Sequence, residues 1–285
     1  MGNIVGLIAG AGRLPPLIAK ALEAHGRSFV VLSYAKSSDQ GEFCGVPCRH
    51  LSLGQVGAAL AFLKDHGVGS LVMAGAFQRP AFKGLKVDLK GAAWLSGLLK
   101  EPSGDDHLLR YLTRKLEGEG FSVISPQSIM PHALHPPGLL AGEALSPSQM
   151  TSVARGFQLL SALSPFDVGQ ALALEEDWIL SIEGAEGTDA LIKRTKALMR
   201  TPGAAFLLKA PKEGQDLRLD PPVLGLDTLS NLLQNGFRGV VFKAPGTLLL
   251  EPLRMQAFAR ENGLIVFGVD DDMLRNTGVM REASS

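Results

Sequence analysis

The chain has 285 residues, of which 46% are hydrophobic and 20% charged, and its 28 basic side chains balance 28 acidic ones. This composition is too apolar and too balanced for a disordered chain, and a formal net charge of zero argues against a nucleic-acid binder. Two cysteines, Cys44 and Cys48, are too few for a disulfide framework, so a reducing compartment is expected. At roughly 150 residues per domain, the length favours two domains.

Apolar strand patterns alternate with helical patterns in the first part of the chain. Strands are expected at 3–9, 29–34, 70–74 and 121–125, and helices at 15–24, 54–66, 92–99 and 105–117. Mostly apolar strands that are separated by helices are typical of a parallel sheet covered on both faces. The pattern therefore predicts a Rossmann-like parallel-sheet domain over residues 1–125.

Residues 126–148 are rich in proline and show little periodicity, so we interpret them as an interdomain connection. Strand patterns recur at 178–182, 204–209, 239–243 and 264–268, and helical patterns at 149–163, 190–200, 228–234 and 253–261. These patterns predict a second domain of mixed α/β structure over residues 149–285, and an α/β fold class for the whole chain.

The sequence predicts no membrane span. Crossing a bilayer takes about 20 consecutive apolar residues, and the apolar runs here are shorter and are broken by glycine, proline or charge. The first residues also lack the basic segment and the cleavage site of a signal peptide. We therefore expect a cytoplasmic protein.

Gly10, Ala11 and Gly12 follow the first expected strand and precede a helix, which is where α/β sheets bind phosphate. The dinucleotide fingerprint is incomplete, because Pro15 occupies the place of its third glycine. No acidic residue ends the second strand, where Tyr34 is followed by alanine and lysine. A tight strand-to-helix turn without a ligand is the alternative interpretation.

The third strand ends in a similar short segment that contains Ala74, Gly75, Phe77 and Gln78. In a doubly wound sheet this segment lies beside the first turn, at the carboxyl ends of the strands where ligands bind. Gln78 is suited to reading a base or a hydroxyl group, and Phe77 to stacking. Plain packing or exposure to solvent would also account for both residues.

The segment E-G-A-E-G-T-D, residues 183–189, links an expected strand to an expected helix. Capping the helix needs only one of its carboxylates, and three carboxylates in a short loop repel one another unless a cation or basic groups offset them. Backbone donors at a helix start, combined with carboxylates, suit a substrate that contains phosphate and metal. We therefore expect Glu186 and Asp189 to bind metal, and Gly187 and Thr188 to contact substrate.

The segment D-L-R-L-D, residues 216–220, is the second acidic motif. Alternation predicts an extended segment with Asp216, Arg218 and Asp220 on one face. A surface ladder of ion pairs is the alternative. Two prolines end the segment abruptly, and catalytic groups are often found in such loops. Lys209, which ends the preceding strand, could contact a phosphate oxygen, so these four residues are candidate catalytic residues.

Five segments occur in order along the chain: G-A-G-R-L-P from Gly10, G-D-D from Gly104, F-D-V-G-Q from Phe166, E-G-A-E-G-T-D from Glu183, and D-L-R-L-D-P-P-V-L-G from Asp216. The second of them would also serve as a plain helix cap. Together they resemble the LpxI family of UDP-2,3-diacylglucosamine pyrophosphatases, over nearly the whole chain to about residue 269. The two acidic segments are specific enough to carry this resemblance, whereas the glycine-rich start alone is not.

The resemblance implies hydrolysis of UDP-2,3-diacylglucosamine to UMP and 2,3-diacylglucosamine 1-phosphate, assisted by Mg2+ or Mn2+, in lipid A biosynthesis. It implies an α/β protein of two domains that holds this lipid-linked substrate between them, forms a homodimer and transiently contacts the inner membrane surface. Asp220 would be the essential aspartate, which binds the cation or orients water, with Asp216 and either Glu186 or Asp189 as further ligands. Lys209 and Arg218 would screen phosphate oxygens. The remaining substrate residues would be 10–12, 74–78, Gln170, Gly187 and Thr188.

Two other functions remain open from the residues alone. One is an oxidoreductase that binds NAD(P) or a nucleotide sugar on the Rossmann-like half. The other is a nucleotide- or lipid-binding protein without catalytic activity. Both would bind a nucleotide without releasing UMP from a UDP-sugar lipid.

Overall fold

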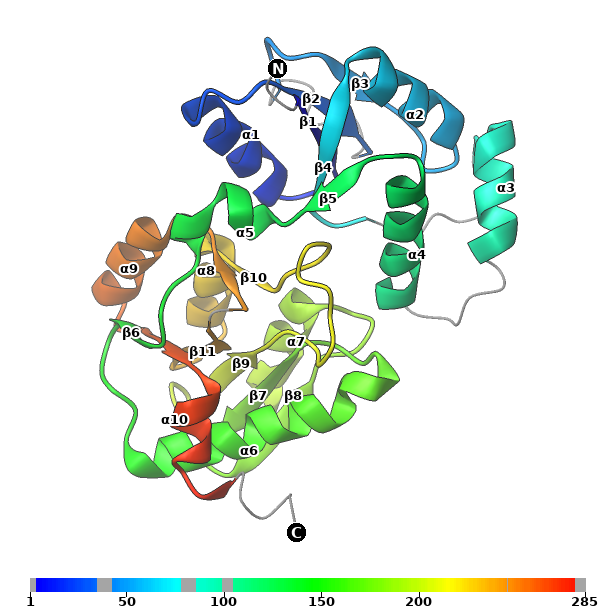
Figure 1. Cartoon of the computed structure of the whole chain (residues 1–285). Coiled ribbons are helices and arrows are strands. Elements are labelled where there is room, and N and C mark those ends of the chain that lie inside the picture. Colours follow the sequence, from blue (N-terminus) through cyan, green and yellow to red (C-terminus); the bar gives the residue numbers. More distant parts are fainter. Residues whose placement is uncertain (1–3, 35–42, 78–85, 99–104, 245, 280–285) are drawn as a thin grey trace. The chain divides into compact units, whose positions relative to one another are not determined.

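A computed structural model describes residues 4–34, 43–77, 86–98, 105–244 and 246–279 (Figure 1). The chain divides into two units, each with its own sheet. The first unit comprises residues 1–131 together with 216–220, and the second comprises 132–215 and 221–285. The chain therefore passes from one unit to the other after Pro131, after Gln215 and after Asp220.

The first unit contains a parallel five-stranded sheet in the order β3-β2-β1-β4-β5. Its strands are β1 (Ile4–Ala9), β2 (Phe29–Ser33), β3 (Cys48–His50), β4 (Val68–Ala74) and β5 (Ser122–Ile124). The central strands are almost wholly buried because helices cover both faces. The strand order reverses between β1 and β4, and ligands of open α/β sheets bind at such switch points.

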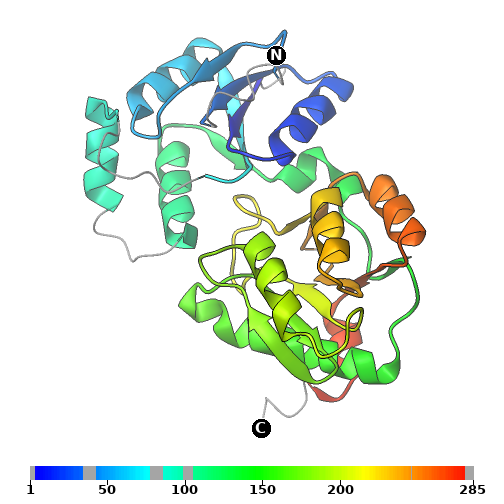
Figure 2. The same cartoon turned by 180° about the vertical axis from the view of Figure 1, so that it is seen from behind.

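Helix α1 (Leu14–Ala24) packs on β1 and β4, and the other long helices of this unit lie across the sheet from it (Figures 1 and 2). These are α2 (Val56–Asp65), α3 (Leu89–Leu98) and α4 (Asp105–Gly118). Their buried side chains, such as Leu63, Trp94 and Leu116, form one hydrophobic core with Ile8 and Leu71 of the strands. A short helix, α5 (Pro126–Ile129), follows β5 and contacts α1.

The second unit contains a mixed six-stranded sheet in the order β6-β13-β11-β9-β7-β8. The strands are β6 (Gly138–Ala141), β7 (Ala171–Glu175), β8 (Trp178–Ile182), β9 (Phe206–Lys209), β11 (Gly239–Lys243) and β13 (Ile265–Val269). Strands β9, β11 and β13 are parallel, whereas β6, β7 and β8 each pair antiparallel with a neighbour. Strands β10 (Val223–Leu224) and β12 (Leu248–Leu249) form a separate parallel pair.

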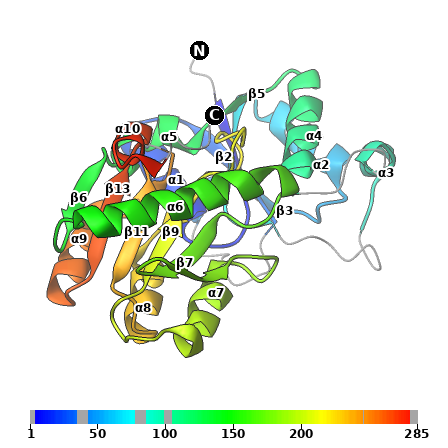
Figure 3. The ribbon, with the colours of Figure 1, turned by 90° about the horizontal axis from the view of Figure 1, so that it is seen from below.

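Helices cover both faces of this second sheet (Figure 3). Helix α6 (Pro147–Leu163) and the short α10 (Asp271–Arg275) pack on one face, and α7 (Thr188–Thr195), α8 (Leu226–Gln234) and α9 (Pro252–Glu261) on the other. The alternation of side chains along each strand divides the core accordingly, so that Leu207 faces α7 and α8 while Leu208 faces α6. Short 3-10 turns complete the described structure: η1 (Pro131–Ala133), η2 (Ser164–Phe166) and η3 (Lys196–Leu198).

The α/β fold class is confirmed, with a Rossmann-like parallel sheet first and a mixed sheet second. The unit boundary differs in detail from the expected connection at 126–148. Helix α5 lies in the first unit, whereas β6 pairs with β13 in the second sheet. No helix among the described residues has the length and apolar character that a bilayer span requires.

Candidate functional site

The carboxyl edge of the second sheet gathers charged and polar side chains. Strand β9 ends at Lys209 and β11 at Lys243. Strand β7 runs in the opposite direction, so its first residue, Ala171, lies opposite Lys209 at the same edge. Strand β8 ends here as well, and Glu183 follows it directly. Ligands of α/β sheets bind outside the carboxyl ends of the strands, which makes this edge the candidate site.

A chain of hydrogen bonds connects three side chains at this edge. The Lys209 ammonium donates to the Thr188 hydroxyl, with 3.1 Å between Nζ and Oγ1. The Thr188 hydroxyl donates to Oε1 of Glu183 at 2.8 Å, and the backbone N–H of Gln170 donates to Oε2 at 2.8 Å. Lys209 and Glu183 are only 7% and 6% exposed. Buried opposite charges stabilise a fold only when further hydrogen bonds complete them, and Thr188 supplies that link.

Glycine permits the close approach of the strands around Glu183. A Cβ atom on Gly169 would lie 2.5 Å from both Cβ and Cγ of Glu183, which is closer than real contacts allow. The loop after Glu183 reaches α7 through Gly187, whose φ of 82° lies in the left-handed region that favours glycine. The glycines at 169 and 187 therefore bring Glu183 and Thr188 together.

Gln170 leaves one polar atom without a partner. Its Oε1 is buried and accepts no hydrogen bond. Its backbone is fully used, because the N–H donates to Glu183 and the carbonyl accepts from Ala210 at 3.0 Å. Since a buried acceptor without a donor is costly, this atom is suited to receive a hydrogen bond from a ligand.

Two further lysines at this edge are paired with aspartates. Lys212 contacts the carboxylate of Asp167, a residue in the left-handed backbone conformation with a φ of 52°. The Nζ atom of Lys243 lies 2.5 Å from Oδ1 of Asp271 and 5.9 Å from the ring centre of Phe157. The edge therefore carries three lysines, and each of them has a carboxylate close by.

Glu186 and Asp189, the expected metal ligands of the first acidic motif, are engaged separately. Glu186 accepts from Nε and Nη2 of Arg194 at 3.0 and 2.8 Å. Its pKa is lowered by the hydrogen bond from its own backbone N–H and by Arg194. Asp189 accepts from Nδ2 of Asn231 on α8 at 3.1 Å. Across the described ranges of the chain, no group of three or more His, Cys, Asp or Glu side chains is arranged to hold a metal ion.

The segment 216–220 belongs to the first unit, and it is a turn and not the extended ladder that alternation predicts. The backbone N–H of Leu219 donates to the carbonyl of Asp216 at 2.9 Å. The Asp216 carboxylate accepts from the backbone N–H of Arg218 at 3.0 Å, and such local side-chain bonds compete with extended structure. Leu219, 5% exposed, packs in the core of the first unit, while Asp220 is exposed.

Arg218 is held by two carboxylates in this turn. Its Nε and Nη2 atoms contact Asp216 at 2.7 to 3.1 Å, and Nη1 lies 3.1 Å from Oε1 of Glu117 on α4. The hydrogen bond to Asp216 raises the pKa of Arg218, and the same bond lowers the pKa of Asp216. The expected role of Arg218 as a phosphate contact stays a prediction, and the structure gives this side chain two protein partners.

In the first unit, the loops that follow β1 and β4 bind to each other. The N–H of Gly10 donates to Ala74, and Ala11 and Ala76 exchange two hydrogen bonds at 2.9 and 2.8 Å. A Cβ on Gly10 would lie 2.6 Å from the Ala76 carbonyl oxygen, and one on Gly75 would lie 2.5 Å from that of Ala11. These glycines therefore serve the contact between the two loops.

The start of α1 is also poor in donors for an anion. Pro15 and Pro16 occupy its first turn and have no N–H groups. Phosphate binding by Gly10, Ala11 and Gly12 stays a prediction that two prolines and the loop contact make less favourable.

Phe77 and Tyr34 lie together at the ends of β4 and β2. Their ring centres are 6.3 Å apart in an edge-on arrangement, and both pack against the core of the first unit. Burial, with a smaller contribution from Asp88, raises the pKa of Tyr34 to about 12. Gln78 and Gly104 lie outside the described residues, and the side chains of Asp105 and Asp106 are not described.

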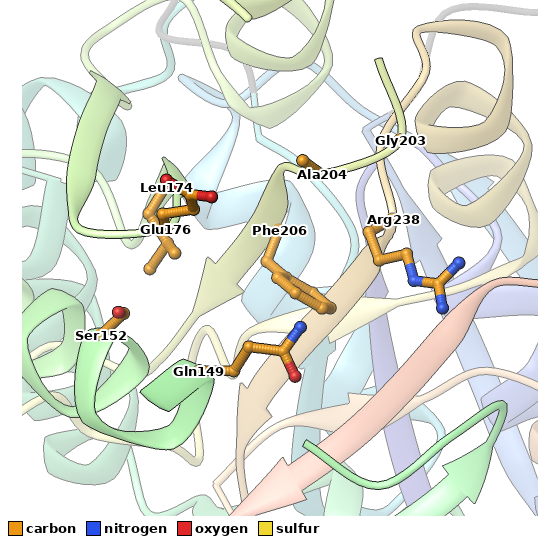
Figure 4. Close-up of a pocket in the computed structure, with 8 residues that line it drawn as sticks. All are labelled: Gln149, Ser152, Leu174, Glu176, Gly203, Ala204, Phe206 and Arg238. Carbon is orange, nitrogen blue, oxygen red and sulfur yellow. The ribbon is translucent and has the colours of Figure 1, made fainter. Parts of the chain in front are cut away.

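A pocket of about 170 Å3 lies at the opposite edge of the second sheet (Figure 4). It is lined by Gln149, Ser152, Leu174, Glu176, Gly203, Ala204, Phe206 and Arg238. Two of its polar side chains have protein partners: Ser152 donates to Asp177 at 2.8 Å, and Arg238 donates to Glu143 at 3.2 Å. The pocket lies near the first residues of β9 and β11, away from Lys209.

Comparisons with known proteins cover nearly the whole chain. A family model described as the LpxI N-terminal domain matches residues 4–133, and one described as the LpxI C-terminal domain matches residues 136–267. A protein of Caulobacter vibrioides named UDP-2,3-diacylglucosamine pyrophosphatase LpxI is 32% identical over 273 residues, which are 93% of this chain and 97% of the relative.

Solved structures give only a distant likeness. The CobK precorrin-6A reductase is 11% identical with a TM-score of 0.29, over 95% of this chain and 88% of its own. A short-chain dehydrogenase/reductase superfamily protein from Agrobacterium tumefaciens with bound NAD is 13% identical with a TM-score of 0.29, over 99% and 98% of the two chains.

Among the predicted site residues, the structure brings Gln170, Thr188 and Lys209 together. Glu183 connects all three and was not among the predicted site residues. The sequence shows three carboxylates in one loop and does not distinguish the buried one from the exposed ones. The available signal is its position directly after β8, where period-2 alternation places it on the same face as the buried Ser181.

Proposed function

Because the chain belongs to the LpxI family, we propose that it hydrolyses the pyrophosphate bond of UDP-2,3-diacylglucosamine to give UMP and 2,3-diacylglucosamine 1-phosphate. The identity to the Caulobacter relative along nearly the full length of both chains carries this proposal. The product lipid is an intermediate of lipid A biosynthesis, so the protein would act in that pathway.

Lys209 is suited to the charge that develops during this reaction. Cleavage of a phosphoanhydride needs an attacking water in line with the leaving oxygen, and neutralisation of charge on the phosphate oxygens. A buried lysine supplies that charge more strongly than an exposed one, because little water screens it. Lys209 is 7% exposed, and Thr188 holds its ammonium group. We assign Lys209 to a phosphate oxygen of the substrate.

Gln170 is suited to a different part of the substrate. Its buried Oε1 has no hydrogen-bond partner. An amide oxygen has no hydrogen to donate, so its ligand must supply the donor. Phosphate oxygens are acceptors, so a hydroxyl or amide N–H group of the glucosamine or of the nucleoside is the matching ligand. Oε1 of Gln170 would thereby contribute to recognition of the substrate, and not to neutralising the charge of its phosphates.

Asp220 is proposed to orient the attacking water, as its place in the family motif implies. It is exposed and follows directly on the turn that Asp216 and Arg218 close. Asp216 and Arg218 would then act on Asp220 through the geometry of this turn. This role accounts for the pairing of Arg218 with Asp216 and Glu117.

The described residues do not fit a preformed site for Mg2+ or Mn2+. Glu186 is paired with Arg194, Asp189 with Asn231, and Asp216 with Arg218. Protein sites for Mg2+ often use one or two carboxylates together with substrate phosphates. Dependence on a divalent cation therefore stays a proposal, to be measured with substrate present. A homodimer and transient contact with the membrane surface are likewise proposals, for sedimentation and vesicle-binding measurements.

Phosphorus NMR of the purified protein with UDP-2,3-diacylglucosamine and Mg2+ or Mn2+ tests the proposal. We expect signals of UMP and of the sugar 1-phosphate to appear, and Asp220→Ala to slow their appearance by roughly 10²- to 10⁴-fold. Asp177→Ala is the matched control, because Asp177 is also an exposed aspartate, in the turn before β8. Binding without UMP release, or binding of NAD(P)H instead, would contradict hydrolysis.

A further inference from the structure

We propose that Glu183 and Thr188 are positioning residues that hold Lys209 in place, and that the Thr188 hydroxyl acts through Lys209 and does not itself donate to substrate. The inference rests on the proposed function for the role of Lys209. Its physical basis is the chain of hydrogen bonds from Glu183 through Thr188 to Lys209.

The direction of each bond follows from the chemistry of the three groups. An ammonium group has only donors, and an ionised carboxylate has only acceptors. Thr188 must therefore accept from Lys209 at 3.1 Å and give its single hydroxyl hydrogen to Glu183 at 2.8 Å. No hydrogen of Thr188 remains for a phosphate oxygen. The side chain instead fixes one of the three N–H directions of Lys209.

Comparison with Glu175, the other buried glutamate in the described part of this unit, shows what is particular to Glu183. Glu175 is 3% exposed, and its carboxylate accepts from the backbone N–H groups of Arg200 and Thr201 at 2.8 and 2.7 Å. The carboxylate of Glu175 therefore fixes the backbone at residues 200 and 201 and holds no side chain through these bonds. Glu183 accepts one backbone N–H, from Gln170, and uses its second oxygen for the hydroxyl that contacts Lys209. Glu183 thus connects the backbone to the buried lysine.

The same comparison provides matched variants. Glu183→Gln and Glu175→Gln both remove one buried charge from this unit. Thr188→Val removes the hydroxyl at almost constant shape, and Thr195→Val does the same on the same helix, where the hydroxyl bonds Ser181 and the carbonyl of Leu191. Thr188→Ser keeps the hydroxyl and loses only a methyl group.

Hydrolysis kinetics and urea unfolding of these variants test the positioning role. We expect Glu183→Gln and Thr188→Val to lower kcat by roughly 10²-fold, the size of effect seen when a reacting group is displaced by about 1 Å, with smaller changes in KM. Thr188→Ser should recover most of the loss. Glu175→Gln and Thr195→Val should lower the unfolding midpoint and leave kcat unchanged. Glu183→Gln added to Lys209→Met should cause no further loss, because the two residues act as a unit.

A second measurement reads Lys209 without relying on activity. Brief acetylation with acetic anhydride, followed by mass spectrometry of the Lys209 peptide, reports how firmly the ammonium group is held. We expect labelling of Lys209 to rise severalfold in Glu183→Gln and Thr188→Val and to stay at the wild-type level in Thr188→Ser and Thr195→Val.

The two measurements separate the inference from the proposed function. Unchanged labelling together with near-normal kcat in Thr188→Val would overturn the positioning role, even if Glu183→Gln did not fold. Equal and additive losses for Glu183→Gln and Lys209→Met would overturn it as well. Increased labelling in a protein whose wild type releases no UMP would support the positioning role and contradict the proposed hydrolysis.

Discussion

Arg218 binds the carboxylate of Asp216, two residues before it, through nitrogen–oxygen contacts of 2.7 to 3.1 Å. The same carboxylate accepts the backbone N–H of Arg218, so one pair of residues closes the turn through side chain and backbone together. Leu219, the residue after Arg218, is buried in the core of the first unit. The conformation that precedes Asp220 is therefore determined by residues other than Asp220 itself.

Arg218→Lys tests whether this turn controls activity. Lysine keeps the positive charge and loses the planar fork that binds a carboxylate through two nitrogens. We expect kcat to fall roughly tenfold through displacement of Asp220, and the free energy of unfolding to change by less than about 1 kcal/mol, since the ion pairs are exposed.

Arg155→Lys is the control for this variant, because Arg155 is an exposed arginine that pairs with Asp177 at 3.4 Å. Steady-state kinetics and urea unfolding measure both quantities. A wild-type kcat for Arg218→Lys would show that the fork is not needed, and the role of Arg218 in the turn would have to be abandoned.

Glu119 makes the stability of the first unit sensitive to acid. Hydrogen bonds from Lys64 and Lys90 lower its pKa from 4.5 to about 2. A carboxyl group with a lowered pKa stabilises the fold fully above its ordinary value, and this contribution is lost as pH falls toward the folded-state value. We therefore expect Glu119→Gln to be less stable than wild type at pH 6, and the difference to shrink between pH 4.5 and 2.

Urea midpoints at several pH values measure this difference. Glu23→Gln, at an exposed glutamate of α1, is the control and should follow wild type throughout. If the difference in urea midpoint between wild type and Glu119→Gln stayed constant from pH 6 to 2, Lys64 and Lys90 would not favour the ionised form of Glu119.

Gly169→Ala should disturb the candidate site from outside it. The added Cβ would lie 2.5 Å from Cβ of Glu183 and 2.6 Å from its carbonyl oxygen, so Glu183 or the strand must move. We expect a loss of about 1 to 3 kcal/mol in the free energy of unfolding, typical of overpacking, together with a loss of kcat similar to that of Glu183→Gln.

Gly118→Ala provides the comparison, because no atom lies within 4 Å of the Cβ that it would add at the end of α4. Urea unfolding and hydrolysis assays on both variants measure the free energy of unfolding and kcat. Full activity in Gly169→Ala would indicate that the position of Glu183 is not critical.

Composition and periodicity predict most strands. They do not predict a strand that forms only because it pairs with a strand distant in the sequence. Strands β8 and β11 lie at the predicted residues, because short apolar runs between turns leave little choice. The sequence pattern places β6 in the connection, because prolines precede it and it pairs with the distant β13. Strand β7 was also missed, and its last residue is a buried glutamate.

The candidate site was predictable in position more than in detail. Residues at strand ends, such as Lys209, could be placed because the sheet determines which ends share an edge. The partners of a carboxylate could not be predicted, because they depend on how the elements pack. Glu186 forms an ion pair with Arg194, and Asp189 accepts a hydrogen bond from Asn231. The turn at Asp216 was missed because its side chain competes for a backbone N–H, which an alternating pattern does not reveal.

Binding of Mn2+, followed by electron paramagnetic resonance, tests the inference that these separately paired carboxylates do not form a metal site. For the protein alone we expect affinity weaker than about 0.1 mM, because the described residues offer no group of three acidic, histidine or cysteine ligands. Addition of UMP should tighten binding beyond that of UMP without protein, since phosphate oxygens then supply ligands. Glu186→Gln should leave the affinity unchanged, because Arg194 already occupies that carboxylate. Tight stoichiometric binding by the protein alone that Glu186→Gln abolishes would restore Glu186 as a ligand and would require Arg194 to release it.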